Sequence, residues 1–253
     1  MLNQKINFLT KTFVTYKECK NYCESKNKNN YENQYLTNYR LKKFSQNYYN
    51  IKKLFLPDFK TLLEVIIIYM SHYKKIPKIL DVGGGFGHCG IYLSKLLNKS
   101  IRYEIVETPS LIRNASKLKL NNIKFHNDFE GLDKNKYDII FSSSTIQYLE
   151  RPYDVIKTLC KSNSMFIAFT RNSFTKKTKI ISQVSQLKKN GFGKSPKKFE
   201  DNKFYFIPHT TIVKEKLIKI MKSYNYKIIL NNNYTESKIG KNKIYSEDII
   251  FSK

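Results

Sequence analysis

Cysteine is scarce in this sequence, which has four cysteines among 253 residues. They lie in a predicted helix, in a glycine-rich stretch and in an apolar helical pattern: Cys19, Cys23, Cys89 and Cys160. None has the spacing with histidine that a zinc site needs. A disulfide framework and a zinc-binding module are therefore excluded, and we expect reduced, buried thiols in a cytoplasmic protein without a metal site.

Long apolar runs are also missing. The first nine residues contain no long apolar core, so no signal peptide is predicted. The most apolar segment, Leu62 to Met70, is too short to span a bilayer and contains Glu64. We expect this segment to be a buried helix and the chain to have no membrane span.

Acidic residues are few beside basic ones, with 20 Asp and Glu against 46 Lys and Arg and a formal net charge of +26. Such a charge favours a polyanionic partner such as RNA. Lysine far outnumbers arginine, however, and Asn, Ile and Tyr are abundant, as an AT-rich coding sequence gives without selection for a ligand. The lysines are also dispersed along the chain, as on a solvated surface. Nucleic acid therefore stays an alternative partner and is not the favoured one.

Glycine is absent from residues 1–75, which are rich in Tyr, Lys and Asn. We predict helices that begin near Thr15 and near Tyr31, and we interpret residues 1–75 as a helical cap or lid. Tyr31, Tyr35 and Tyr39 either face a substrate or cover the core, and both readings stay open.

Glycine is concentrated directly after the predicted strand Lys78 to Val82, where it fills four of the five positions from 83 to 87. Ile91 to Leu97 is predicted to form the helix that follows. Glycines allow the backbone to approach a ligand and to adopt positive φ angles. A strand, a glycine turn and a helix in this order predict a nucleotide-binding site.

One register of this turn fits a dinucleotide site. Gly85, Gly87 and Gly90 match G-x-G-x-x-G, and Glu107 lies about twenty residues further on, as that fingerprint requires. An NAD(P)-dependent enzyme is therefore one alternative.

An earlier register matches D-x-G-x-G-x-G and resembles the signature of class I S-adenosylmethionine (SAM)-dependent methyltransferases: Asp81, Gly83, Gly85 and Gly87. A dinucleotide brings a pyrophosphate to the helix N-terminus, where the carboxylate of Asp81 would repel it. SAM has no phosphate and carries an ammonium and a sulfonium, which suit an acidic strand end. Charge therefore favours the methyltransferase register, in which SAM is the cofactor and Phe86 belongs to the binding turn.

From Ile76 the chain alternates strands and helices, which predicts a parallel sheet. We expect strands at residues 78–82, 101–107, 123–126, 137–142 and 164–170, helices at 109–118, 152–159 and 212–224, and a C-terminal strand pair at 226–230 and 245–251. The resulting fold class is a Rossmann-like α/β class I methyltransferase fold, with a seven-stranded, mostly parallel sheet and an antiparallel C-terminal strand. Residues 76–253 form this core, and residues 171–211 are expected to be a loop-rich insertion.

Acidic residues follow successive strands of this plan, at the edge where ligands of open parallel sheets bind. The backbone of residues 83–87 is expected along the methionine part of SAM, with Asp81 near its charged end. Glu107 can accept two hydrogen bonds from ribose hydroxyls. Asp128 can accept one from the adenine amino group, and Phe129 offers the ring an apolar face.

The fourth strand leads into residues 142–149, which are expected to pass closest to the sulfonium, and Ser143 is assigned there to the cofactor. Gln147 or Tyr148 could orient a methyl acceptor, although helix-cap serines and a core tyrosine explain the same residues. The Asn-Pro-Pro-Tyr type of sequence found in enzymes that methylate base amino groups is absent. Its absence disfavours a nucleic-acid acceptor.

Four segments together resemble a family of bacterial methyltransferases from surface-polysaccharide gene clusters: residues 81–84, 106–109, 142–153 and 170–174. The similarity runs from about Thr15 to the C-terminus, and Gln147-Tyr148 with Arg171 is its most distinctive part. The family commonly has Thr-Pro after this arginine, whereas this chain has Asn172-Ser173. The resemblance implies a saccharide or glycan-precursor acceptor.

Methyl transfer from a sulfonium is an in-line displacement, so a protein mainly supplies positioning and, for a hydroxyl acceptor, a general base. His209 is the best candidate base, because its ordinary pKa suits proton abstraction, and a helix-entry histidine is its alternative role. Arg171 could hold an anionic acceptor by a bidentate contact or form a surface ion pair. The leading prediction is methylation of a saccharide or other small metabolite. An RNA methyltransferase and a non-catalytic SAM-binding scaffold are further alternatives.

Overall fold

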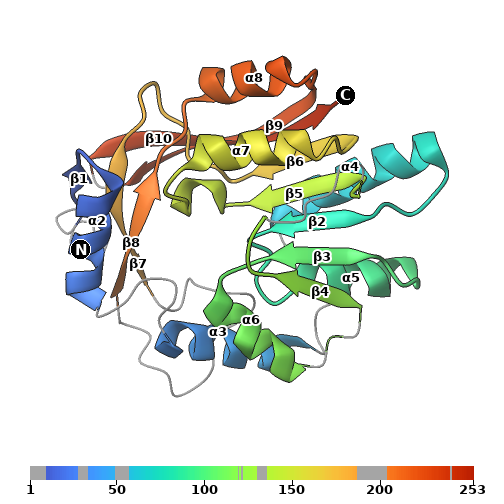
Figure 1. Ribbon diagram of the computed structural model, residues 1–253, viewed down its shortest axis with the longest axis horizontal. Coiled ribbons are helices and arrows are strands. Elements are labelled where there is room, and N and C mark those ends of the chain that lie inside the picture. Colours follow the sequence, from blue (N-terminus) through green and yellow to red (C-terminus); the bar gives the residue numbers. More distant parts are fainter. Residues whose placement is uncertain are drawn as a thin grey trace.

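The computed structural model describes residues 10–27, 34–48, 57–118, 120, 122–129, 136–186, 204–239 and 241–253. Within these residues the chain forms a seven-stranded sheet covered by helices on both faces and a separate three-stranded sheet beside it (Figure 1). The large sheet carries the core of the protein, and the small sheet lies next to one edge of it.

The large sheet has the strand order β4-β3-β2-β5-β6-β10-β9. Its strands are β2 (Ile79–Val82), β3 (Tyr103–Val106), β4 (Ile123–His126), β5 (Ile139–Ser143), β6 (Phe166–Thr170), β9 (Lys227–Ile239) and β10 (Asn242–Ser252). The first five are parallel, whereas β10 is antiparallel to both β6 and β9. This order and these directions confirm the Rossmann-like α/β fold with a mostly parallel sheet, and they confirm the C-terminal hairpin.

Helices α4 (Pro57–Tyr73) and α5 (His88–Leu97) cover one face of the sheet. Within α4, buried residues recur at the spacing of one helix face: Leu62, Val65, Ile66 and Tyr69. The predicted buried helix is therefore confirmed, and its apolar stripe lies against the strands. Burial of one such side chain stabilises the fold by about 1.5–3 kcal/mol.

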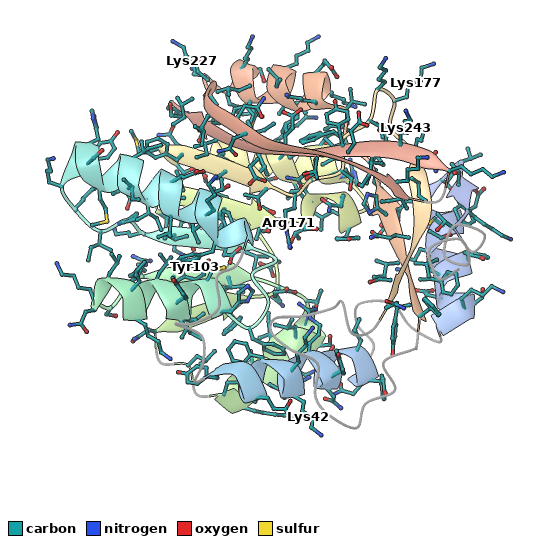
Figure 2. All side chains as sticks on the ribbon, turned by 180° about the vertical axis from the view of Figure 1, so that it is seen from behind. Lys42, Tyr103, Arg171, Lys177, Lys227 and Lys243 are labelled. Carbon is teal, nitrogen blue, oxygen red and sulfur yellow. The ribbon has the colours of Figure 1, made fainter. Side chains whose placement is uncertain are left out.

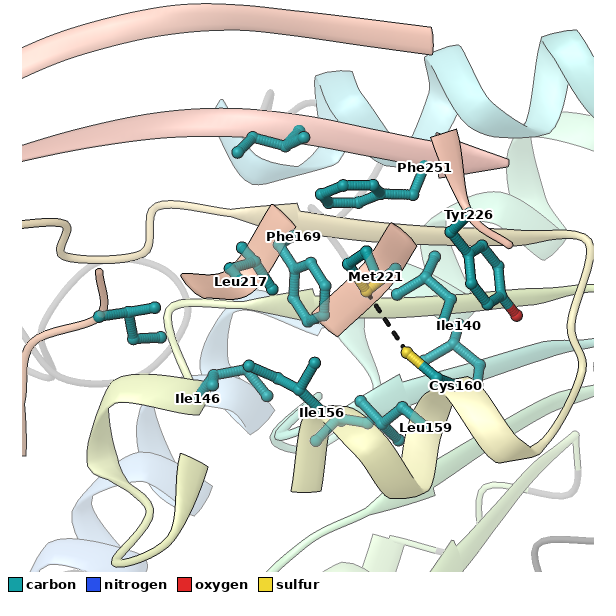
Figure 3. Packing of buried hydrophobic residues seen from close by; sticks show 14 of the residues in the cluster. Ile140, Ile146, Ile156, Leu159, Cys160, Phe169, Leu217, Met221, Tyr226 and Phe251 are labelled. Atoms are coloured by element: carbon teal, nitrogen blue, oxygen red, sulfur yellow. Dashed lines mark hydrogen bonds between the residues drawn. The ribbon is translucent and has the colours of Figure 1, made fainter. Parts of the chain in front are cut away.

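The other face is covered by α7 (Pro152–Lys161) and α8 (Lys214–Ser223) (Figure 3). Phe169 and Phe251 of adjacent strands meet edge to face there, with ring centroids 6.2 Å apart. The thiol of Cys160 on α7 contacts the sulfur of Met221 on α8 at 3.4 Å. All four cysteines are buried and free, as predicted.

Residues 171–211 differ from the loop-rich insertion that we expected, because their described part forms two strands. Strands β7 (Ile180–Gln186) and β8 (Phe204–Thr210) pair antiparallel, and β1 (Thr12–Phe13) pairs with β7. Along β7, both apolar and polar residues are buried, namely Ile181, Ser182, Val184 and Gln186. Residues 187–203 of the insertion lie outside the described residues.

The described part of residues 1–75 does not form one separate cap over the core. Helix α2 (Tyr16–Asn27) packs against the small sheet through Cys19 and Cys23, and α3 (Gln34–Asn47) packs beside α6 (Pro109–Ala115). Helix α4 belongs to the core itself. Tyr39 is fully buried, Tyr35 is exposed, and Tyr31 lies outside the described residues.

Within the described ranges, none of the helices combines the length and the apolar character that crossing a membrane demands. The same part of the chain brings no three His, Cys, Asp or Glu side chains together as a metal site would.

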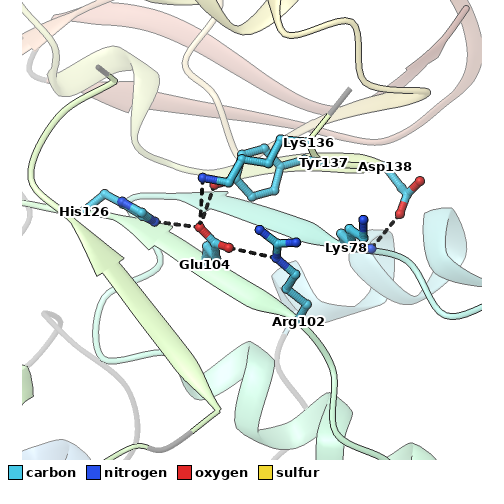
Figure 4. A network of polar contacts seen from close by, with 7 residues as sticks. All are labelled: Lys78, Arg102, Glu104, His126, Lys136, Tyr137 and Asp138. Atoms are coloured by element: carbon cyan, nitrogen blue, oxygen red, sulfur yellow. Dashed lines mark hydrogen bonds and ion pairs between the residues drawn. The ribbon is translucent and has the colours of Figure 1, made fainter. Parts of the chain in front are cut away.

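A buried carboxylate on β3 is held by four polar neighbours (Figure 4). Glu104 accepts hydrogen bonds from Arg102 at 2.9 Å and from Tyr137 at 2.7 Å, and its other contacts are His126 at 2.7 Å and the ammonium of Lys136 at 3.6 Å. Burial alone raises the pKa of Glu104, but the hydrogen bonds and the lysine charge outweigh burial and lower its pKa to about 2.

Replacing Glu104 with glutamine is expected to lower the free energy of unfolding by about 1–3 kcal/mol at neutral pH, because charge-assisted hydrogen bonds are lost. A lowered folded-state pKa stabilises the protein above the ordinary value of 4.5, and this stabilisation disappears as the pH falls toward 2. The stability difference between wild type and E104Q should therefore shrink below pH 4.5 in urea titrations. The exposed Glu215 on α8 provides the control E215Q. A pH-independent difference would contradict the prediction.

Candidate functional site

The turn between β2 and α5 depends on glycine for its conformation. Gly83, Gly85 and Gly87 have φ angles of 79°, 60° and 80°, which side chains rarely tolerate. The amide of Gly83 donates to the carbonyl of Val106 at 2.9 Å and ties the turn to β3. A Cβ atom on Gly90 would lie 2.7 Å from the ring of Tyr103, so this glycine allows α5 to pack closely.

Asp81 lies beneath the turn and is only 2% exposed. Its carboxylate accepts a hydrogen bond of 2.6 Å from the hydroxyl of Tyr103. A Cβ atom on Gly84 would lie 2.3 Å from the same carboxylate, so the turn rests directly on it. Asp81 therefore supports the turn from below and places negative charge under it.

Glu107 stands at the tip of β3 beside the turn. One carboxylate oxygen accepts from the amide of Gly85 at 3.1 Å, and the other accepts from the amide of Thr108 at 2.9 Å. The guanidinium of Arg40 on α3 lies 3.8 Å from the first oxygen, and the side chain of Glu107 is 8% exposed. These contacts fix the direction of the carboxylate while each oxygen keeps capacity for a further donor.

Phe86 is buried, and its side chain does not face outward from the turn. Its ring packs against Phe44 of α3, with centroids 5.5 Å apart, in a cluster that includes Leu111. Only the backbone of Phe86 is placed for a ligand. After β4, Asp128 is exposed and the half-buried Phe129 packs against the core.

At the ends of β5 and β6, Ser143 accepts a hydrogen bond of 3.2 Å from Nε of Arg171. The amide of Arg171 donates to Asp248 at 3.1 Å, and the other oxygen of Asp248 accepts from Thr61 at 2.8 Å. Figure 2 shows Arg171 between the core and the small sheet. Asp248 and Thr61, which the sequence patterns did not single out, thus anchor the backbone that carries Arg171.

Gln147 is buried and contacts the backbone of Arg171. Its Nε2 donates to Oγ of Ser144 at 3.0 Å and to the carbonyl of Arg171 at 3.3 Å. Its buried Oε1 has no hydrogen-bond partner among the described residues. An unpaired buried acceptor costs about 1–3 kcal/mol, so a polar ligand that donates to it would be stabilising.

Tyr148 and His209 are brought together by Gln183 of β7. The Tyr148 hydroxyl donates to Oε1 of Gln183 at 2.9 Å, and Nδ1 of His209 contacts the same oxygen at 2.8 Å. Because a carboxamide oxygen only accepts, the contact requires a proton on Nδ1 of His209. The two rings meet edge to face at 5.3 Å.

His209 was expected to be a candidate base, with a position at a helix entry as its alternative, and the structure places it elsewhere. It lies on β8, not at the start of a helix, and is 1% exposed. Burial lowers its pKa to about 3, so the imidazole is a weak base near neutral pH. These observations favour a positioning role in which His209 holds Gln183, and through it the phenol of Tyr148.

A cavity of about 290 Å³ lies beside α5 and before β4. Its lining consists of Tyr48, Gly90, Ile91, Ser94, Lys95, Leu120, Asn122 and Ile123. None of the predicted cofactor or acceptor residues lines it, so we do not assign it to the site at the carboxyl ends of the strands.

No protein-family model matches the chain, and no protein of curated function matches its sequence. Several solved structures are similar. A magnesium protoporphyrin IX methyltransferase from Synechocystis PCC 6803 with bound S-adenosylhomocysteine (SAH) is 15% identical, with a TM-score of 0.48 over 77% of this chain and 82% of that chain. A 1,6-didemethyltoxoflavin-N1-methyltransferase from Burkholderia thailandensis, with bound 1,6-didemethyltoxoflavin and SAH, is 10% identical, with a TM-score of 0.45 over 84% of this chain and 86% of that chain.

A SAM-dependent methyltransferase from Clostridium acetobutylicum ATCC 824 is 14% identical, with a TM-score of 0.48 over 77% of this chain and 91% of that chain. At such identities and TM-scores, these likenesses assign neither a cofactor nor a substrate to this chain. The functional argument therefore rests on the side chains described above.

Proposed function

We propose that the protein is a SAM-dependent methyltransferase whose acceptor is a small molecule, in particular a saccharide or glycan precursor. The observation that carries the proposal is the anchored carboxylate of Glu107 beside a turn with three positive-φ glycines. A carboxylate held at a strand tip can bind two ribose hydroxyls, and the turn allows the backbone to approach the ligand.

The charges at this edge fit SAM better than a dinucleotide. Asp81 lies beneath the turn and Glu107 beside it, so a pyrophosphate at the start of α5 would meet two carboxylates. The ammonium and sulfonium of SAM would be attracted instead. We assign residues 83–87 to the methionine part, Asp128 and Phe129 to adenine, and Ser143 to the edge near the sulfonium.

The acceptor side is assigned to Gln147, Tyr148 and Arg171, which enclose the ends of β5 and β6. SAM supplies an electrophilic methyl group when it is bound. Because the Tyr148 proton is directed at Gln183, the lone pairs of the phenol can accept a hydrogen bond from an acceptor hydroxyl. Oε1 of Gln147 can accept a second one.

The saccharide class is supported by the family resemblance of residues 142–153 and 170–174, and two acceptor oxygens suit a molecule with several hydroxyls. An RNA acceptor finds less support, because the lysines are spread over the molecule. Figure 2 places Lys42 on one side and Lys177, Lys227 and Lys243 on the opposite side. We propose a cytoplasmic location on the basis of the four free, buried thiols.

Titration calorimetry with SAH and with NAD tests this function. We expect SAH to bind with a Kd in the micromolar range, about −8 kcal/mol, and NAD not to bind at the same concentration. Binding of NAD without binding of SAH would refute the proposal. If SAH binds but no saccharide, nucleotide-linked sugar or RNA is methylated by SAM, the non-catalytic scaffold becomes the better assignment.

A further inference from the structure

Helix α3 is fixed over the turn by contacts to three parts of the structure. The hydroxyls of Thr37 and Ser110 lie 3.3 Å apart and join α3 to α6. Phe44 packs on Phe86 of the turn itself. At the other end of the helix, Leu36 and Tyr39 pack with Tyr205 and Ile207 of β8. Helix α3 is therefore held at both ends, and the side chain of Arg40 between them has a defined direction.

Arg40 reaches the carboxyl ends of the strands from this helix. Its Nη2 lies 3.8 Å from Glu107, and it would lie 3.5 Å from a Cβ atom at Gly85. The Arg40 side chain is 15% exposed, and its guanidinium makes no hydrogen bond within the described part of the chain. The five N–H donors of the Arg40 guanidinium thus lie beside the turn, and their one interaction in the described part of the chain is the long ion pair with Glu107.

The ion pair with Glu107 does not explain the placement of Arg40. Each oxygen of Glu107 already accepts a backbone hydrogen bond, and a separation of 3.8 Å is too long for a hydrogen bond to the guanidinium. A planar fork of donors beside a ligand-binding turn is suited to a carboxylate or phosphate. The carboxylates of Asp81 and Glu107 at this edge disfavour a phosphate. Of the two groups that suit the guanidinium, a ligand carboxylate is therefore the remaining candidate.

We propose that Arg40 binds the carboxylate of the methionine part of SAM. This inference rests on the proposed function. SAM has one negative group, and burial of that group beside the turn requires a charged partner. Arg171 is the other arginine at this edge, but its Nε is directed at Ser143 and its backbone is tied to β10, which places it on the acceptor side. Glu107 remains assigned to the ribose hydroxyls of SAM.

The test compares two ligands that share adenosine and sulfur but differ in the amino-acid part. SAH carries the carboxylate, whereas 5′-methylthioadenosine (MTA) does not. Calorimetry with both ligands is applied to the wild type and to R40M, R40K, R171M and the control K42M. Lys42 is exposed on the same helix and extends away from the core (Figure 2). Thermal unfolding of each variant checks that α3 still folds against α6.

In R40M, SAH is expected to bind at least tenfold more weakly than in the wild type, because charge-assisted hydrogen bonds are lost, while the Kd of MTA changes less than about twofold. R40K should lie between wild type and R40M for SAH, because lysine keeps the charge and loses the fork. K42M should leave both ligands unchanged. R171M loses the contact with Ser143, so it should affect SAH and MTA alike and show no selective loss of SAH.

Three results would overturn the inference. Equal weakening of SAH and MTA in R40M would show that Arg40 acts through Glu107 or α3. Tighter binding of both ligands would show that Arg40 competes with ribose for Glu107. A selective loss of SAH in R171M and not in R40M would assign the carboxylate to Arg171. Failure of the wild type to bind either ligand would instead refute the proposed function itself, and the role of Arg40 with it.

Discussion

Replacing Glu107 with alanine is expected to weaken SAH binding about a hundredfold. Two hydrogen bonds from ribose hydroxyls to a charged acceptor together contribute about 3 kcal/mol or more, and each 1.4 kcal/mol is a factor of ten in Kd. Alanine also removes the acceptor that the amide of Gly85 uses. Both losses fall on the same part of the site, so SAH and MTA should be weakened alike, unlike the selective effect expected of Arg40.

The E107Q variant separates these two losses. Glutamine keeps a carbonyl oxygen that can accept from Gly85, but it lacks the charge and the second acceptor oxygen. Its Kd for SAH should therefore lie between those of wild type and E107A. The exposed Glu215 on α8 gives the control E215A, which removes one charge far from the turn. If the Kd of SAH for E107A stays within about twofold of the wild-type value, Glu107 does not bind the ribose hydroxyls.

The sequence predicted the large sheet well because its signals are local. The parallel strands are short segments, most of them apolar runs, and the observed bounds of β4 and α7 fall within two residues of the predicted ones. The C-terminal pair was also recognisable, although β9 extends beyond Leu230 to Ile239. Buried strands in an α/β fold therefore need little tertiary information to be found.

The small sheet could not be predicted in the same way. Strand β1 has two residues and acquires its structure only by pairing with β7, about 170 positions later in the chain. In β7, apolar and polar residues do not alternate regularly, as Ile181, Gln183 and Val184 show. The sequence pattern alone therefore gives only a weak signal for a strand, and pairing with β8 is needed to form it. For the same reason the alternative position of His209 at a helix entry is not found, because pairing with β7 puts this residue on a strand beside Gln183.

The candidate site shows the same division. The glycine turn and Glu107 are adjacent in sequence to a strand, so a motif could identify them. Arg40 and Gln183 carry no local signal, because their positions depend on how α3 and the small sheet pack against the core. The expected contribution of Asp81 illustrates a further limit: the motif identified the residue, but only the structure shows that Tyr103 and the turn cover its carboxylate.

Replacing Gly83 with alanine is expected to lower the free energy of unfolding by about 2–5 kcal/mol. The φ angle of 79° costs an L-residue about 1–2 kcal/mol. In addition, the new Cβ atom would lie 2.0 Å from Oγ1 and 2.5 Å from Cγ2 of Thr145, and relief of such overlap in a packed region costs about 1–3 kcal/mol more. Urea unfolding of the variant measures the sum.

G85A is the matched control, because Gly85 has a φ of 60° but its nearest neighbour for a Cβ atom is Arg40 at 3.5 Å, an ordinary contact. It should therefore lose only the strain of about 1–2 kcal/mol. The double variant G83A/T145A removes Oγ1 and Cγ2 of Thr145 but keeps its Cβ atom, which would lie 2.7 Å from the new methyl group. It should therefore recover part of the loss of G83A, while the φ strain and this contact remain. If G83A and G85A cost the same, or if T145A recovers nothing, the close approach of Thr145 to the turn does not explain why glycine is needed at position 83.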